Sequence, residues 1–218
     1  MDVRYFLERR LSFITQLYER SSNLFIEIKR KIEAGEPPYV PPYSEDGEPP
    51  FIAEWIEAEE SLQVLGRACI SMLSAAFHLY FRTWERELGR PVDDTLKKTF
   101  KKHGWFNGYK QHYLKKFGIN FEESECNLNL LEELVLARNR VQHPDSISSH
   151  SSYYSDDDLE KVPTPFFIDA REAELAESTE QTERTWLFPP TIHVTSEKLS
   201  FAVAEIRLFT AWLEDTDH

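Results

Sequence analysis

The segment LARNRVQHPDS, residues 136–146, gathers at the end of a leucine-rich run the side chains that could act on a phosphate. Arg138 carries a planar guanidinium whose several N–H donors match phosphate oxygens. His143 is the kind of side chain that exchanges a proton near neutral pH. An arginine that holds a phosphate beside a histidine that moves a proton suits phosphodiester chemistry, so both are candidate site residues.

Helical geometry places Asn139 between these two residues. Asn139 and His143 are four apart and share one face of a helix, while Arg138 flanks Asn139 on its other side. Arg138 also continues the apolar spacing of two upstream leucines, so it emerges on the core-facing side near the helix end. Pro144 disfavours helical backbone in the residue before it, which makes His143 the last helical residue or its cap.

Two interpretations of this segment stay open on the residues alone. In the structural one, Arg138 forms a salt bridge, for instance with Glu132 or Glu133, and His143 only caps a helix. In the functional one, the polar tip lies in a groove and its groups face a ligand. The two differ in what they predict, because structural residues should be tied to a local carboxylate or carbonyl.

The string RNRVQH resembles the Arg-Asn-x-x-x-His motif of HEPN domains (higher eukaryotes and prokaryotes nucleotide-binding), which are helical bundles that carry it on a late helix. The resemblance implies a metal-independent endoribonuclease without a cofactor. It also implies a homodimer in which two Arg/His pairs form one composite site. Arg138 would then hold the scissile phosphate of RNA, His143 would act as general acid or base for attack by the 2′-hydroxyl, and Asn139 would orient the site.

The same resemblance extends to neighbours and partners. Arg140 and Gln142 would help to position the substrate. Toxin–antitoxin and antiviral defence are the implied settings, with an antitoxin or another regulatory protein as partner. One subgroup of the family extends the motif to His-x-Tyr, but Asp145 stands at that place here, so a tyrosine-modified toxin is not expected. The alternative is a non-catalytic helical module that binds RNA, a nucleotide or a protein through the same cleft.

The charge is unevenly spread along the chain. A formal net charge of −13 argues against a non-specific nucleic-acid binder. Residues 95–117 nevertheless contain lysines and no acid, and we predict that four of these lysines bind substrate: Lys97, Lys98, Lys101 and Lys102. Aromatic residues lie among the lysines, and they either stack on bases or fill the core: Trp105, Phe106, Tyr109 and Tyr113. A solvated basic face neutralised by the acidic segments is the alternative.

Apolar spacing predicts a mainly α fold, and the resemblance implies a HEPN-like bundle made of residues 1–145 plus 195–218. The expected helices are 2–34, 51–88, two short ones around HGWFNG, a motif helix over 130–143 capped by Asn129 with Glu132, and a closing helix that begins at Thr195 or Ser196. Residues 146–194 are expected to be an insertion of loop and short strands, in which TPFFIDA and TWLFPPTIHV pair as a small hairpin.

The remaining signals concern location and other chemistry. Two cysteines without metal-ligand spacing, a charged N-terminal segment and the lack of an apolar run of about 18 residues predict a cytoplasmic protein with no membrane span and no metal. His78 lies among aromatic residues and is interpreted as a core histidine. No phosphate-binding loop, dinucleotide fingerprint or other catalytic motif competes with RNRVQH.

Overall fold

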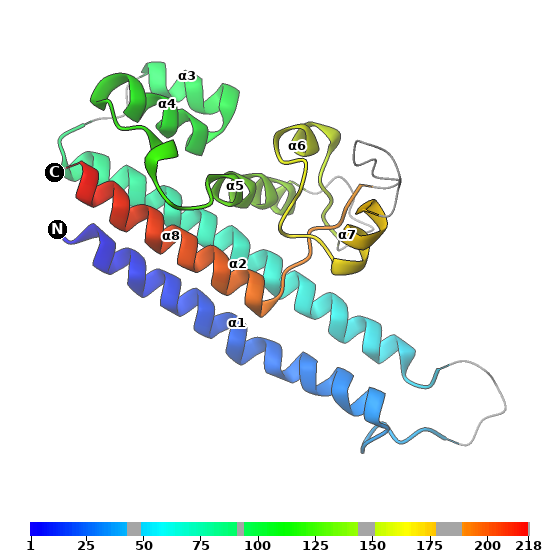
Figure 1. Ribbon diagram of the computed structural model, residues 1–218. Coiled ribbons are helices and arrows are strands. Elements are labelled where there is room, and N and C mark those ends of the chain that lie inside the picture. Colours follow the sequence, from blue (N-terminus) through cyan, green and yellow to red (C-terminus); the bar gives the residue numbers. More distant parts are fainter. Residues whose placement is uncertain (43–48, 91–93, 144–150, 178–188, 218) are drawn as a thin grey trace.

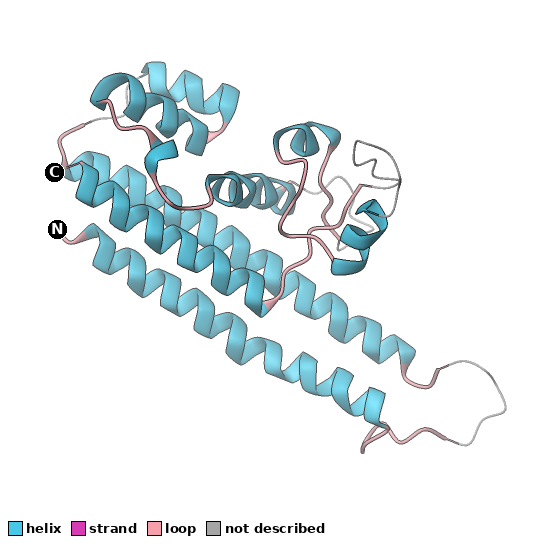
Figure 2. Cartoon of the chain, viewed as in Figure 1, coloured by secondary structure: helices cyan, strands magenta, loops and turns pink. Residues whose placement is uncertain are grey.

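The structure is a computed structural model that describes residues 1–42, 49–90, 94–143, 151–177 and 189–217. Within these ranges the chain is mainly helical, which confirms the predicted fold class (Figure 2). The helices are α1 (Val3–Ala34), α2 (Ile52–Glu87), α3 (Asp94–His103), α4 (Trp105–Phe117), the 3-10 turn η1 (Phe121–Glu123), α5 (Leu128–Gln142), α6 (Asp156–Lys161), α7 (Ala170–Glu177) and α8 (Ser196–Thr216).

A long antiparallel hairpin of α1 and α2 forms one side of the bundle, and α8 lies against both helices (Figure 1). Asp2 caps α1 by accepting from the Tyr5 amide, and Gly35 ends the helix in a left-handed conformation. The apolar stripe of α1 is buried over its first half, from Val3 to Tyr18. The apolar face of α8 is also buried, and Thr195 caps that helix.

The motif helix α5 packs on α2 and α8 and lies across their direction (Figure 1). It begins two residues earlier than predicted, because the side chain of Asn127, and not that of Asn129, accepts from the Leu130 amide. Glu132 was expected to complete that cap, but its carboxylate accepts from Asn107 of α4. The Glu132 side chain could either cap its own helix or bind a neighbour from elsewhere in the fold, and here it binds Asn107.

The aromatic residues of the lysine-rich segment belong to the core. Trp105, Phe106, Tyr109 and Tyr113 are at most 9% exposed, and the Tyr109 ring stacks on Phe81 with 4.5 Å between centroids. The interpretation of these rings as stacking platforms for bases is therefore wrong. Their spacing along α4 turns them toward α2. Burial of four large rings stabilises the folded protein, and this stabilisation would be lost if the rings stayed in water to bind a ligand.

The segment after the motif helix is helical where a β appendage was expected. The described part of residues 146–194 contains α6, α7 and one isolated antiparallel bridge between Tyr153 and Thr191, but no strand. The first part of TWLFPPTIHV lies outside the described residues. TPFFIDA forms no strand because Glu133 of α5 accepts from the amides of Phe166 and Phe167, which a strand partner would otherwise use.

A close contact with α2 fixes the return of this segment to the bundle. Residues 192–194 lie directly on α2, where Gly66 has no side chain, and an added Cβ there would stand 2.6 Å from the Val194 Cβ. Gln63, one turn away, accepts from the Val194 amide at 3.0 Å. The glycine of this apolar helix therefore serves a close approach of the backbone.

The composition of α2 also bears on the membrane. In the part of the chain that the structure describes, α2 alone is long and apolar enough to cross a membrane, but 56% of its most apolar window is buried inside the protein. Core helices of soluble proteins have the same property. The expectation that the chain does not span a membrane stays a prediction.

Candidate functional site

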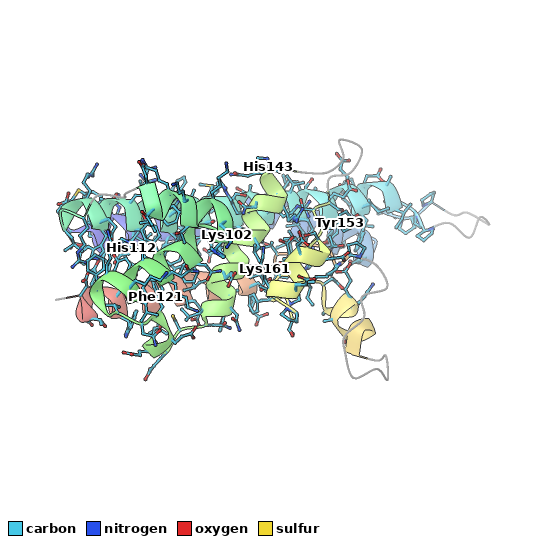
Figure 3. All side chains as sticks on the ribbon, turned by 90° about the horizontal axis from the view of Figure 1, so that it is seen from above. Lys102, His112, Phe121, His143, Tyr153 and Lys161 are labelled. Carbon is cyan, nitrogen blue, oxygen red and sulfur yellow. The ribbon has the colours of Figure 1, made fainter. Side chains whose placement is uncertain are left out.

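At the end of α5 the side chains of Arg138 and Asn139 are in contact, whereas the described contact of His143 with Asn139 is a backbone hydrogen bond of the helix. Neither Arg138 nor His143 lines the pocket beside Asn139. Arg138 Nη1 donates to Asn139 Oδ1 at 3.0 Å, and the His143 amide donates to the Asn139 carbonyl at 3.0 Å. His143 is the C-cap residue, as predicted, and leaves the helix with φ −129° and ψ 66°. Its side chain is exposed at the tip of α5, whereas Arg138 and Asn139 are half-buried (Figure 3).

The carboxylates expected to neutralise Arg138 are engaged elsewhere. Glu132 accepts from Asn107 Nδ2 at 2.5 Å. Glu133 is 1% exposed and accepts from the Tyr154 hydroxyl and from two backbone amides of the following segment. Among the residues that the structure describes, no carboxylate forms an ion pair with Arg138. The structural interpretation allowed a carboxylate or a carbonyl as the partner, and Arg138 does donate to a local carbonyl oxygen, that of the Asn139 side chain. The two interpretations therefore both stay predictions.

Arg140 and Gln142, the predicted positioning residues, are placed differently from Arg138. Arg140 Nε donates to Asp158 Oδ2 at 2.5 Å, and its Nη2 donates to the Ser155 hydroxyl. Both partners belong to the capping box that begins α6, so Arg140 attaches α6 to α5. Gln142 is exposed beside His143. Substrate positioning by these two residues stays a prediction.

A basic pocket lies beside Asn139. It has a volume of about 270 Å³, and its lining includes Lys101, Lys102, Asn139 and Lys161. Figure 3 shows Lys102 and Lys161 on neighbouring elements, α3 and α6, next to α5. Lys101, Lys102 and Lys161 are exposed, and within the described ranges none of them pairs with a carboxylate.

The other two predicted lysines lie outside this pocket. Lys97 forms an ion pair with Asp94 at 3.0 Å on the exposed side of α3, and Lys98 is exposed next to it. The fold therefore divides the four lysines that the sequence grouped together. Two of them meet Asn139 at a concave surface, and two face solvent on the outer side of α3.

His78 is a neighbour of the site that the sequence did not indicate. Its ring stacks on Trp105 with 4.7 Å between centroids and an interplanar angle of 8°. Burial lowers the pKa of His78 to about 4, with smaller contributions from the positive charges of Arg82 and Arg138. Two arginines from different helices therefore act electrostatically on one half-buried imidazole. The only sequence signal was the i, i+4 spacing of His78 and Arg82.

The described residues contain no group of three or more His, Cys, Asp or Glu side chains suited to hold a metal ion. Cys69 and Cys126 are free and buried, and burial raises the pKa of the Cys69 thiol to about 11. A thiol with so high a pKa is a poor nucleophile at neutral pH.

Comparison with known proteins identified no relative of this chain. No family model, no curated protein and no solved structure matches the chain.

Proposed function

We propose that this protein is a metal-independent endoribonuclease that uses Arg138, Asn139 and His143 on single-stranded RNA. The observation that supports it best is the absence, among the described residues, of any carboxylate partner for Arg138, next to a pocket whose lysines are also unpaired there. Lysines that line one pocket without a described carboxylate partner, in a chain of net charge −13, favour an anionic ligand in that pocket, and Asn139 joins the pocket to Arg138. The HEPN resemblance supplies the reaction class.

The proposed reaction needs no group beyond those on α5 and the substrate. One imidazole accepts the proton of the 2′-hydroxyl while the 2′-oxygen attacks the phosphorus. The bond from phosphorus to the 5′-oxygen breaks, and the leaving oxygen takes up a proton. The products are a 2′,3′-cyclic phosphate and a 5′-hydroxyl. Arg138 stabilises the charge that develops on the phosphate, and Asn139 fixes the guanidinium through its amide oxygen.

Two proton transfers are needed, and a homodimer would supply two His143 side chains. An exposed stripe along α2 supports such a pairing. It begins with acids, continues with small and apolar residues and ends with bases: Glu54, Glu57, Val64, Ala68, Ala75, Leu79, Arg82 and Arg86. A second copy in antiparallel orientation would place the acidic end of each stripe against the basic end of the other.

The groove beside this stripe is apolar and open. It has a volume of about 700 Å³ and is lined on α1 by Tyr5, Phe6 and Phe13, which are 51%, 53% and 59% exposed. Contiguous exposed aromatic residues of this kind are typical of an interaction surface. Arg82 lies on the stripe and acts on His78 together with Arg138, so the stripe adjoins the candidate site.

The cleavage proposal is tested with a mixed RNA pool in EDTA. Wild-type protein should release cyclic-phosphate ends, and Arg138→Ala and His143→Ala should each lose roughly 10²–10⁴-fold in rate while staying folded. Arg20→Ala, an exposed arginine on α1 far along the chain from the site, is the matched control and should cut normally. Equal cutting by all four proteins would contradict the assignment of the site.

If wild-type protein does not cut RNA, binding measurements decide between the remaining functions. If wild-type protein binds RNA but does not cut it, and Arg138→Ala weakens the binding, the nuclease proposal fails and the non-catalytic module replaces it. If neither RNA nor nucleotides bind, both functions fail and the α5 tip is a structural helix end.

The dimer is tested by charge exchange across the stripe. Sedimentation should show a dimer for the wild type, a weaker one for Arg86→Glu and for Glu54→Arg, and recovery in the double variant. Lys115→Glu, on the exposed side of α4, is the control. A wild-type monomer at all concentrations, or single variants that dimerise normally, would rule this pairing out.

A further inference from the structure

The basic pocket beside Asn139 has a second feature, a polar pair among its cations. Lys101, Lys102 and His103 line it from the end of α3, and Lys161 lines it from α6. Glu132 and Asn107 line the same pocket, and Asn107 Nδ2 donates to Glu132 Oε1 at 2.5 Å. One pocket therefore offers ammonium groups for a phosphate and a fixed acceptor group for a hydrogen-bond donor.

The position of Lys161 is set by the motif helix itself. Arg140 of α5 binds Asp158 and Ser155 at the start of α6, and Lys161 is the last residue of that short helix. Asp158 is 5% exposed, so its contact with Arg140 is shielded from water. The arginine that the sequence assigned to the substrate thus holds in place a lysine that faces the pocket.

The acceptor pair gives the pocket a preference among bases. Because the Asn107 amide donates to one carboxylate oxygen, the other Glu132 oxygen and the Asn107 amide oxygen are left as acceptors. The Watson–Crick edge of guanine presents two adjacent donors, N1–H and the N2 amino group, whereas uracil presents one donor there. Single-stranded RNA is commonly read through this edge. A carboxylate therefore favours guanine over the other three bases.

The size of the pocket limits the ligand to no more than one nucleotide. Its volume of about 270 Å³ lies just below the usual range of small-ligand pockets, which starts at about 300 Å³, and it is too small for a duplex. Lys102 and Lys161 line this one pocket from different elements next to α5 (Figure 3).

We propose that the pocket lined by Lys101, Lys102, Lys161, Asn107 and Glu132 binds one guanine nucleotide of the RNA strand. Its phosphate lies at the lysines and its base edge at Glu132. The proposal deepens the proposed function and rests on it for the choice of RNA as the ligand. It also gives the segment after the motif helix a role, because Lys161 belongs to that segment.

The first test measures binding of the four nucleoside 5′-monophosphates to the full chain by calorimetry. We expect GMP to bind at least 10-fold more tightly than AMP, CMP or UMP. Glu132→Gln should remove most of this preference. Lys161→Gln should weaken the binding of all four nucleotides about equally, and the slope of log affinity against log salt concentration should fall by about the share of one charge. Lys115→Gln, exposed on α4 outside the pocket, should bind like the wild type.

The outcomes separate this proposal from the nuclease. Equal binding of the four nucleotides, or a GMP preference unchanged in Glu132→Gln, overturns the guanine pocket even if RNA is cut. Selective GMP binding without RNA cleavage keeps the pocket and removes the nuclease. A thermal melt of each variant accompanies the titration. If Glu132→Gln is unfolded, the exposed Lys161→Gln decides, because unchanged binding in that variant excludes the phosphate site.

Discussion

The middle and the end of α5 carry polar residues that the fold treats in opposite ways. In the middle, Glu133 is buried and accepts from the Tyr154 hydroxyl and the Phe167 amide. At the end, the described hydrogen bond of Arg138 goes to the side chain of its neighbour Asn139, and the lysines of the adjacent pocket are unpaired in the described ranges. Burial requires a polar group to find a protein partner, whereas a half-buried group can instead be solvated or bind a ligand.

The largest expected effect comes from a change at Glu133, in the buried middle of α5. Glu133→Ala leaves the Tyr154 hydroxyl and the amides of Phe166 and Phe167 without an acceptor, so we expect a loss of roughly 3 kcal/mol in the free energy of unfolding. Tyr154→Phe removes one donor only and should cost about 1 kcal/mol. Urea denaturation measures both values. If the two variants are equally stable, Glu133 is not the anchor of this segment.

Arg140→Ala should have the next largest effect. It removes the attachment of α6 and leaves Asp158 buried without a cation, for a loss of about 1–2 kcal/mol. Hydrogen exchange of the α6 amides should rise in this variant and stay unchanged in Arg138→Ala. If the α6 amides lost protection from exchange equally in both variants, Arg140 would not differ from Arg138 in holding α6.

Glu85 gives a smaller effect that depends on pH. Burial raises the pKa of this carboxyl, against weaker opposing effects of Tyr113 and Arg90. Its contribution to stability is therefore complete below the unfolded value, near 4.5, and is lost as the pH rises through the higher folded pKa. Glu85→Gln cannot ionise, so it should lose less stability than the wild type from pH 4 to 8. Parallel urea midpoints for the two proteins over this range would contradict the assignment.

The smallest effect on folding is expected where the effect on function is greatest. Arg138→Ala removes a side chain whose only described hydrogen bond goes to Asn139, so the free energy of unfolding should change by less than about 0.5 kcal/mol. A thermal melt beside the cleavage assay checks both properties on one sample. If Arg138→Ala were strongly destabilised, Arg138 would have a structural role, like Glu133.

Local signals in the sequence predicted the helices well. Gly35, Thr195 and the apolar stripes of α1 and α8 define their elements through neighbours within one or two turns, and the structure agrees. Distant contacts were not predictable in the same way. The partners of Glu133 lie 21 to 34 residues further along the chain, and Arg140 meets Asp158 18 residues away. No periodicity encodes such pairs.

The candidate site was predictable only in part for the same reason. Arg138, Asn139 and His143 form a local set, so helical geometry was enough to group them. The pocket beside them needed α3, α4 and α6 to meet α5, and Glu132 had been assigned to a cap. The aromatic residues near the lysines showed that composition alone does not separate a binding surface from a core, because all four are buried.

The bare surface of α2 at Gly66 has a consequence for how distant changes reach the site. A methyl group there would act as a wedge against Val194. The adjacent His193 amide donates to the Phe167 carbonyl, and the Phe167 amide donates to Glu133, just over one turn before Arg138 on α5. A Gly66→Ala change in the middle of an apolar helix would thus press on a chain of contacts that ends at Glu133 on the motif helix.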